Sequence, residues 1–588
     1  MSSNRAGVRG ALARLAALTG GISLALVVGC APPNGRQGGN GGNGGGGGSG
    51  GIDVGGGGSG GGGGGTCSGN SCSPSCQAAI DNHSSIGCEY YAIDMDGASG
   101  PPYDACYAVF VANVSMQPAH LSVDWGGQTI DLSQFAKLPA GTGQSLSYQA
   151  YDANSGLQPG AVAILFLDYG MGTVQDFGNV PCPVPAALGT GVQVHGTGVG
   201  TAFHITTDTP VVAYQELPYG GGKAAATGAS LLIPTSAWQS NYIAVSAWDA
   251  PAMGIPVNVG GPSHNIVALY DQTTVGMRPL SNIAAGTNVP AGTANMPWSI
   301  TLNRGQYVQL TQSDPLSGSA ITSSAPVGVF GGHQIMDIDR CCGDHGEQMM
   351  TPVTALGSEY VAAPHGTRKP DGTPDPRVFH IYGAVDGTQL TYEPANLGAA
   401  TIDQGKMIEI RTSSAFVVRS QDTNHPFALF TYMTGAGDSD TTASDYDPNW
   451  AGGFGDADFV RVVPPPQYLS HYVFFTDPTY PFTTLTVTRQ KVNGAFADVT
   501  LDCLGTIPAA DWQAVGTSGQ YQIAYEKLVD HWSSGVGTCN NGVHVMDSSQ
   551  QFGVWVWGWG SVDTNTGWVS YGYPAGEAVL PINNVVIQ

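Results

Sequence analysis

Imidazole and carboxylate side chains gather between residues 333 and 347 of this chain. The group comprises His333, Asp337, Asp339, Asp344, His345 and Glu347, with Cys341 and Cys342 among them. Zinc and other transition metals take these ligand types in proteins. No HExxH-like spacing fixes two of them on one face, so we predict no bound metal. We expect a disulfide-bonded loop between strands whose polar side chains bond the backbone. It is our first candidate for a binding site, through His333, Asp344, His345 and Glu347.

A row of aromatic side chains could do a different kind of chemistry. Trp555, Trp557 and Trp559 alternate with Val556, Gly558 and Gly560, so a strand here places three indoles on one face. Such a face can stack on sugar rings, which makes carbohydrate binding one interpretation. The alternative is that the indoles close the core of the last part of the fold, since three tryptophans bury roughly 450–750 Å².

Carboxylates recur more loosely between residues 438 and 458. They are Asp438, Asp440, Asp445, Asp447, Asp456 and Asp458. Ca²⁺ takes six to eight oxygen ligands and could use them, so it is the only cofactor that the sequence suggests. The spacing matches no known calcium loop. A solvated insertion is therefore the simpler interpretation, and we predict no required cofactor.

Motifs for catalysis and for nucleic-acid binding are missing. The chain has no GxSxG elbow between a strand and a helix, no HExxH and no P-loop lysine, so we predict that it is not an enzyme. Its formal net charge is −24, and only 11% of its residues are charged. Such a charge repels phosphate backbones, which argues against nucleic acid as a partner.

The cysteine count favours an oxidising compartment. Of 11 cysteines, one (Cys30) stands apart near the N-terminus, and the remaining even number is typical of disulfides in exported proteins. Cys67, Cys72, Cys76 and Cys88 lie close together and predict a small cross-linked segment over residues 66–89. Cys503 and Cys539 are alone in the last quarter, so they are the one pair that we predict.

The sequence around Cys30 predicts export and lipidation. Arg5, Arg9 and Arg14 precede an apolar run over residues 15–28, which is shorter than the roughly 20 residues of a membrane-spanning helix. Val27-Val28-Gly29-Cys30 then resembles the bacterial lipobox, in which a signal peptide is cut before a cysteine that becomes acylated. We predict a signal peptide over residues 1–29 and an outer-membrane lipoprotein at the cell surface. The membrane is then a partner through the lipid alone.

Residues 30–65 join this cysteine to the rest of the chain. They are mostly glycine and have almost no apolar surface to bury, so we expect a linker without a fixed fold. A glycine-rich coil of this length spans about 30–36 Å. The linker therefore holds whatever follows it away from the lipid headgroups.

Residues 90–588 show the short alternating runs, bounded by Gly, Pro, Asn and Asp, that are typical of strands. Similar markers recur about every 110 residues: a proline before an apolar run at Pro210, Pro326 and Pro426, and a tyrosine at Tyr242, Tyr360 and Tyr472. We predict an all-β fold of tandem sandwich-like antiparallel modules of about 110 residues. A β-propeller-like ring is the alternative, but propeller blades usually take about 40–50 residues.

Five motifs occur in one order that resembles the N-terminal domain of the IgGFc-binding protein family. They are Gly87–Asp94, Ala105–Asn113, Pro210–Gln215, Pro326–His333 and Asp344–Gln348. The similarity extends over residues 75–588. It implies a secreted, non-enzymatic binding or adhesion module. The cysteine-rich von Willebrand-type repeats of the animal members are absent, so the resemblance does not imply their polymer-forming role.

Together these observations predict a tethered surface protein that binds an external macromolecule, such as a glycoprotein or matrix component. Its partners would be an extracellular protein or a glycan. Two alternatives stay open: a structural component of the envelope or extracellular matrix, and a carbohydrate-binding protein.

Overall fold

The computed structural model describes residues 75–97, 105–168, 180–189, 191–221, 224, 226–250, 261–340, 342–439 and 453–588, with two short strands, β1 (Cys67–Ser68) and β2 (Ser71–Cys72), ahead of them. Helices are short there: α1 (Cys76–Asn82) and α2 (Leu132–Phe135). None of the helices in these residues is long and apolar enough to cross a membrane. The described part of the chain is built from antiparallel sheets.

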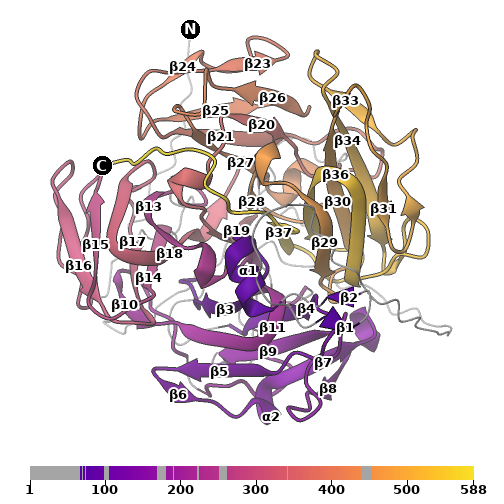
Figure 1. Ribbon diagram of the computed structural model, residues 1–588, viewed down its shortest axis with the longest axis horizontal. Coiled ribbons are helices and arrows are strands. Elements are labelled where there is room, and N and C mark those ends of the chain that lie inside the picture. The colour runs from indigo at the N-terminus through magenta and orange to yellow at the C-terminus, as the bar shows by residue number, and fades with distance from the viewer. Residues whose placement is uncertain are drawn as a thin grey trace, which may run out of the picture.

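Four groups of strands, which we call modules 1 to 4, lie around a common centre (Figure 1). Module 1 is a nine-stranded sheet of β3 (Gly87–Ala92), β4 (Tyr107–Asn113), β5 (Leu121–Trp125), β6 (Gln128–Thr129), β7 (Ala136–Ala140), β8 (Ser147–Ala150), β9 (Val162–Asp168), β11 (Phe203–Leu217) and β12 (Gly228–Leu231). Module 2 is an eight-stranded sheet of β10 (Gly198–Thr201), β13 (Gln239–Ile243), β14 (Pro262–Ala268), β15 (Thr273–Arg278), β16 (Trp298–Leu302), β17 (Gln306–Thr311), β18 (Ala320–Asp337) and β19 (Gly343–Met349).

The second half of the chain forms the other two modules. Module 3 consists of three smaller sheets: β20 (Glu359–Ala362), β26 (Phe416–Arg419) and β23 (Thr391–Glu393); β25 (Met407–Arg411), β21 (Arg377–Gly383), β27 (Phe427–Met433) and β28 (Asp458–Arg461); and β22 (Thr388–Gln389) with β24 (Thr401–Ile402). Module 4 is a nine-stranded sheet of β29 (Leu469–Thr476), β30 (Phe482–Gln490), β31 (Val499–Leu501), β32 (Gly505–Thr506), β33 (Gln513–Val515), β34 (Tyr521–Asp530), β35 (Ser533–Ser534), β36 (Gly542–Trp559) and β37 (Ser570–Pro574).

Long bent strands give the modules their shape. The first half of β18 pairs with β13 and β15, and its second half pairs with β14 and β19. β11 and β36 change partners in the same way, and in module 3 the equivalent strand is divided into β26 and β27. Each module is therefore curled into two half-sheets, which confirms the predicted antiparallel sandwich-like fold. The β-propeller-like ring, the alternative prediction, is not formed, because these curled sheets do not close as propeller blades.

Proline marks the place where a long strand changes partners. Pro210 and Pro326 each stand directly before the residue at which pairing with the inner strands begins, Val211 and Val327. Proline has no backbone N–H to donate to a ladder, so it fits where one ladder ends and the next begins. The proline spacing seen in the sequence thus has a structural cause.

A buried tyrosine fastens this same place in every module. Tyr90, Tyr242, Tyr360 and Tyr472 donate a hydrogen bond from their hydroxyl to the carbonyl oxygen of Val211, Val327, Phe427 and Phe552, at 2.7, 2.8, 2.7 and 2.5 Å. All four rings are at most 2% exposed. Each bond ties a neighbouring strand (β3, β13, β20 or β29) to the bend of the long strand of its module.

Removing one of these tyrosine hydroxyl groups should lower the free energy of unfolding measurably. We expect Tyr360→Phe to lower the free energy of unfolding by about 1–2 kcal/mol, because the carbonyl of Phe427 and the N–H of Gly357 both lose their partner. Urea unfolding measures this loss. Tyr270→Phe is the matched control, since Tyr270 is 56% exposed, and it should change stability by less than about 0.5 kcal/mol. Equal effects of the two changes would contradict the role of Tyr360.

The centre of the molecule is made by one short strand from each module. β12 contacts β19 and β37, and β28 contacts the same two strands. The labels of β19, β28 and β37 lie near the centre of Figure 1. The chain end closes the arrangement: Ser85 N donates to Glu577 O at 2.8 Å, and Val579 N donates to His83 O at 2.7 Å. The side-chain amide of Asn583 then donates to the carbonyl of Val353, in the connection between modules 2 and 3, and the N–H of Ile587 donates to Asn241 of module 2. The C-terminal segment therefore fastens three modules together.

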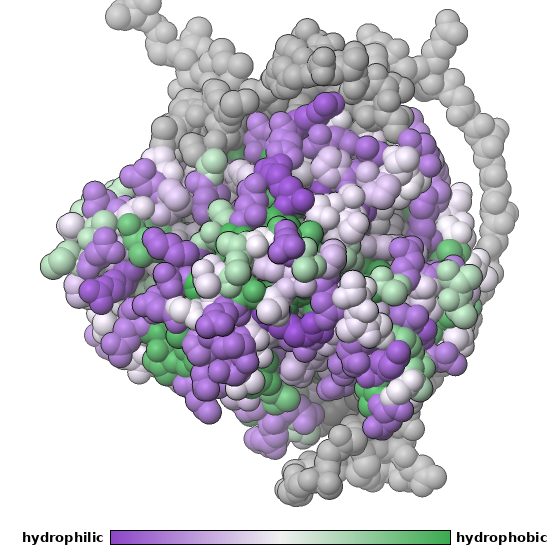
Figure 2. All heavy atoms as spheres, turned by 90° about the horizontal axis from the view of Figure 1, so that it is seen from above, coloured by the Kyte–Doolittle hydropathy of each residue, from purple (hydrophilic) through white to green (hydrophobic). Residues whose placement is uncertain are grey.

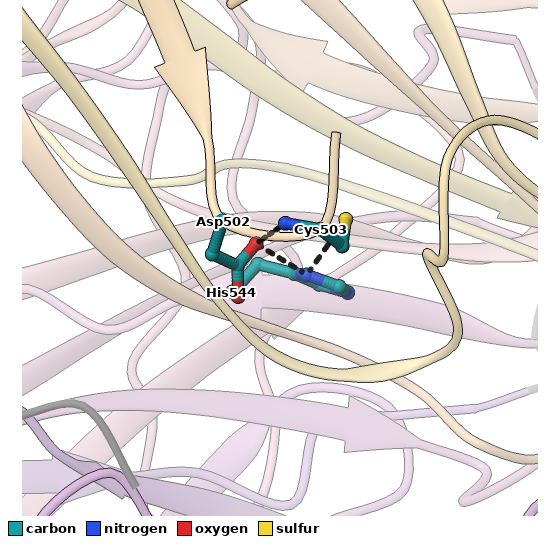
Figure 3. A group of neighbouring side chains, drawn as sticks. All are labelled: Asp502, Cys503 and His544. Atoms are coloured by element: carbon teal, nitrogen blue, oxygen red, sulfur yellow. Dashed lines mark hydrogen bonds and ion pairs between the residues drawn. The ribbon is translucent and has the colours of Figure 1, made fainter. Parts of the chain in front are cut away.

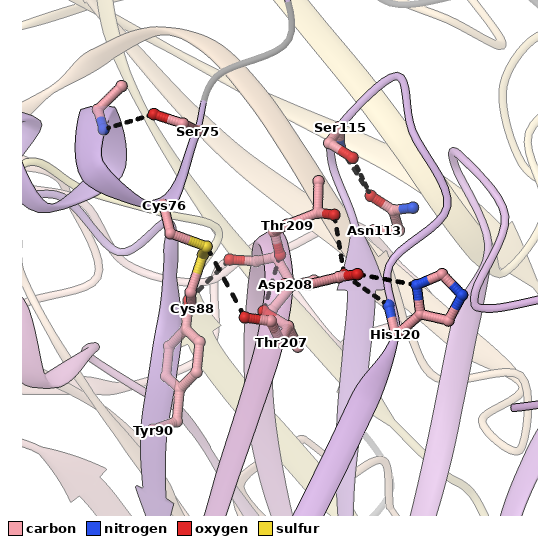
Figure 4. The surroundings of a disulfide bond; sticks show 12 residues. Ser75, Cys76, Cys88, Tyr90, Asn113, Ser115, His120, Thr207, Asp208 and Thr209 are labelled. Atoms are coloured by element: carbon pink, nitrogen blue, oxygen red, sulfur yellow. Dashed lines mark hydrogen bonds and ion pairs between the residues drawn. A yellow bond between two sulfur atoms is a disulfide. The ribbon is translucent and has the colours of Figure 1, made fainter. Parts of the chain in front are cut away.

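Disulfides join neighbouring elements. They link Cys76 to Cys88, Cys106 to Cys182, and Cys503 to Cys539, and Cys342 is also disulfide-bonded. The predicted pair Cys503–Cys539 is confirmed. Cys76–Cys88 attaches α1 to β3 beside the bend of β11, where Asp208 accepts hydrogen bonds from the backbone and ring of His120 (Figure 4).

Hydrophobic residues on the face drawn in Figure 2 are scattered in small groups among hydrophilic ones. This face has no single large apolar patch of the kind that marks many protein–protein interfaces.

Candidate functional site

The four side chains predicted to form a binding loop lie in the interior. His333, Asp344, His345 and Glu347 are all 0% exposed, on β18 and β19. The prediction of a loop is wrong here, because residues 343–349 form a strand that pairs with β18 and packs between β12 and β28. Buried side chains at the centre do not offer a surface to an external macromolecule.

These residues belong to a buried group of carboxyls. Asp344 accepts hydrogen bonds from the hydroxyl of Ser570 and the N–H of His345, at 2.9 and 3.0 Å. Burial, together with nearby Asp456 and Asp458, raises the pKa of Asp344 well above its usual value. Burial also raises the pKa of Asp456 to about 7 and that of Glu347 to about 8. The group therefore holds protons near neutral pH, as expected of carboxyls removed from water.

The tryptophan row is also interior. Trp555 and Trp557 are 0% exposed and Trp559 is 2% exposed, where β36 faces module 3. The indole N–H of Trp555 donates to the carbonyl of Arg461 at 3.0 Å. These indoles close a core, as the alternative interpretation had it, and offer no face to a sugar.

The loosely spaced aspartates do not form one loop. Asp456 and Asp458 are buried at the centre, and Asp438 lies 3.4 Å from the guanidinium of Arg340. Asp440, Asp445 and Asp447 lie outside the described residues.

One group of described side chains has the spacing of metal ligands. Asp502, Cys503 and His544 place their ligand atoms within 4.8 Å of one another (Figure 3). However, the sulfur of Cys503 is bonded to Cys539, so it is not a thiolate. His544 lies 3.1 Å from Asp502 through Nδ1 and 2.6 Å from the carbonyl oxygen of Asn540 through Nε2. With the thiolate consumed, the group offers too few ligands for a closed metal site.

A polar pocket lies between modules 1 and 2. Its volume is about 350 Å³, and it is lined by Tyr91, Asp124, Gly126, Gly127, Thr129, Thr201, Ala202, His204, Arg304 and Gly305. One rim is the two-residue turn between β5 and β6, where Gly126 and Gly127 have φ of 59° and 78°. Positive φ at both turn residues is the type I′ geometry that glycine favours. The opposite rim is the turn before β17.

His204 lines this pocket and lies between two carboxylates. Its Nδ1 lies 2.7 Å from Asp124 Oδ2 and its Nε2 lies 2.8 Å from Glu89 Oε1. Burial lowers the pKa of His204, but the bonds to Glu89 and Asp124 outweigh burial, so the pKa is raised. Since both ring nitrogens face carboxylate oxygens, both carry protons and the ring is an imidazolium.

Arg304 connects this group to module 2. Its Nη2 donates to Glu89 Oε1 at 3.2 Å, and its Nε donates to the hydroxyl oxygen of Tyr91 at 2.9 Å. The ring of Tyr91 stacks on that of His204 with centroids 4.6 Å apart. Two cations and two anions are thus held together across the boundary between the modules.

Residues 228–558 match the family model described as IgGFc binding protein, which is more than half of the chain. The chain belongs to this family. No curated protein matches the chain. The part that matches the IgGFc-binding family model begins at β12, so it includes Arg304 but not Glu89, Asp124 or His204.

The pocket of this IgGFc-binding family member was not predicted from the sequence. Its residues come from separate segments that only strand pairing brings together: His204 pairs with Tyr91 on one side and with Asp124 on the other. Glu89 and Tyr91 have no chemical signature of their own in the sequence. Alternation along β11 could have placed His204 on an outward face, but not next to its two carboxylates.

Proposed function

We propose that this protein is a lipid-anchored, surface-displayed and non-enzymatic binding module for an external macromolecule, such as a glycoprotein or matrix component. Membership of a family described as binding protein carries the proposal. The disulfides support an exported, extracellular-type protein. The finer parts, lipidation at Cys30 and the outer membrane, are supported by the sequence Val27–Cys30 and the residues before it.

The proposed organisation follows from this role. Residues 1–29 would be the signal peptide, residues 30–65 the lipidated cysteine and linker, residues 66–89 a small cysteine-rich segment, and residues 90–588 the binding body. The pocket between modules 1 and 2 is the candidate contact site. The buried residues at the centre and the tryptophans of β36 would stabilise the body rather than bind.

The anchor is tested by labelling cells that express the full chain with a palmitate analogue. We expect label on the wild type and none on Cys30→Ser, with globomycin blocking removal of residues 1–29. Label that is retained by Cys30→Ser, or absent from both proteins, would contradict the proposed anchor.

The binding function is tested with the full chain, purified in detergent, on arrays of extracellular proteins and glycans. We expect retention of a limited set of ligands that survives washing. Absence of binding on both arrays, by protein that unfolds cooperatively, would contradict a binding function.

A further inference from the structure

We infer that the pocket between modules 1 and 2 binds a neutral, polyhydroxylated ligand: one sugar unit of a glycan. This inference rests on the proposed binding function and names the chemistry of the ligand. Four observations carry it: the size of the pocket, its internal charge balance, its spare hydrogen-bonding atoms, and the bonds that hold it in place.

The volume suits a small unit rather than a protein segment. Small-molecule sites measure about 300–1,000 Å³, and at about 350 Å³ this pocket is at the small end of that range. A side chain at Gly126 or Gly127 would meet no atom within 4 Å, so this rim is open. The cavity around Arg461 and Glu577, by contrast, has room for only about 20 Å³, roughly one water molecule.

The charges of the pocket are already balanced. His204 is paired with Glu89 and Asp124, and Arg304 is paired with Glu89. Two cations and two anions leave no net charge to attract an ion. An anionic or cationic ligand would have to displace an existing partner, and a charge left unpaired in a partly buried site is costly. Internal balance therefore favours an uncharged ligand.

The pocket nevertheless keeps both acceptors and donors. Among the described residues, Asp124 Oδ1 and Arg304 Nη1 make no hydrogen bond, and these side chains are 32% and 53% exposed. The Tyr91 hydroxyl accepts from Arg304, so its own proton remains to be donated. A ligand hydroxyl can donate to a carboxylate and accept from a guanidinium, and bonds to charged groups are the stronger ones. Neighbouring hydroxyls on a sugar ring match this set.

The side chains are held in place before any ligand arrives. The hydrogen bonds from His204 and Arg304 to Glu89, a further bond from Thr235 to Glu89 at 2.7 Å, and the stacked ring of Tyr91 fix the pocket across two modules. Little ordering is left for the ligand to impose, which lowers the entropic cost of binding.

The test uses the full chain in detergent on an array of neutral glycans, with free monosaccharides as competitors. We expect the wild type to bind a set of glycans, and Asp124→Asn and Arg304→Gln each to weaken binding about tenfold or more. The matched controls are Asp314→Asn and Arg278→Gln, which make the same changes at exposed positions outside the pocket. They should bind like the wild type. Thermal unfolding of all five proteins shows whether each variant is folded.

Each outcome separates this inference from the proposed function. If glycans bind and only the pocket variants lose affinity, the inference is supported. If glycans bind equally well to folded pocket variants, this pocket is not the glycan site, but the proposed binding function is retained. If only proteins bind, and they still bind after enzymatic deglycosylation, the ligand is not a sugar unit, but the proposed binding function is retained. Absence of binding on protein and glycan arrays alike overturns both.

Discussion

Glu347→Gln should make the protein markedly less sensitive to raised pH. Burial raises the pKa of Glu347 from 4.5 to about 8, so the folded state holds this proton more tightly than the unfolded chain. The resulting stabilisation is fully present below pH 4.5 and is lost as the pH rises through about 8. A difference of this size corresponds to a free energy on the order of 3–5 kcal/mol. Glutamine cannot ionise, and its carbonyl still accepts the hydrogen bond from Gln215.

The measurement is the free energy of unfolding of wild type and variant in urea between pH 4.5 and 9. We expect similar stability near pH 4.5 and a growing advantage for Glu347→Gln towards pH 9. Comparing the two proteins cancels the contributions of buried carboxyls that Glu347 does not influence, such as Asp456, whereas Glu347 contributes to the raised pKa of Asp458. Asp314→Asn, at an exposed carboxyl, should follow the wild type. A constant difference across the range would contradict a raised pKa at Glu347.

The second large effect is expected at the buried ion pair that fastens the end of the chain. Arg461 Nη2 lies 2.5 Å from Glu577 Oε1 and Nη1 lies 3.2 Å from Oε2, and the side chains are 7% and 1% exposed. Arg461→Met leaves a buried carboxylate without its partner, which costs about 3–5 kcal/mol. Glu577→Gln should cost a similar amount, because it leaves the buried guanidinium of Arg461 without its carboxylate partner. The double change to methionine at both positions should recover most of the loss, because no charge then stays buried.

Urea unfolding of the two single variants and the double variant measures these energies. Arg411→Met is the matched control, since Arg411 is 46% exposed and its ion pairs with Asp339 and Glu409 should contribute about 1 kcal/mol or less. Single variants at Arg461 or Glu577 that lose no more than this control would contradict a structural role for the buried pair.

The fold could be predicted because its signals are local. Short alternating runs bounded by Gly, Pro, Asn and Asp predict strands, and strands such as β15 do have side chains that are alternately buried and exposed. The recurring prolines and tyrosines lie at the bends of long strands, so they mark equivalent places in different modules. Cys503 and Cys539 could be paired because no other cysteine lies near them in the sequence.

The functional site could not be predicted for two physical reasons. Cys341, Cys342 and the polar residues around His345 suggested a disulfide-bonded loop, whereas residues 343–349 form a closely packed strand: a side chain at Gly346 would lie 2.5 Å from Cβ of Ala247. Asp344 and Glu347 are tolerated in the interior because burial raises their pKa, so that they stay protonated, and because Ser570 and Gln215 donate hydrogen bonds to them. A sequence shows neither the burial nor these partners. The pocket, in turn, depends on the pairing of β3 and β5 with β11, at long sequence separation.

We propose that the folded body faces outward from the cell on a lipid-anchored linker. The most direct test is to treat intact cells with a membrane-impermeant amine reagent and to quantify modification of Lys527, whose side chain is 51% exposed, by mass spectrometry. We expect as much modification of Lys527 in intact cells as in lysed cells, while cytoplasmic proteins stay unmodified. Modification of Lys527 only after lysis would contradict it.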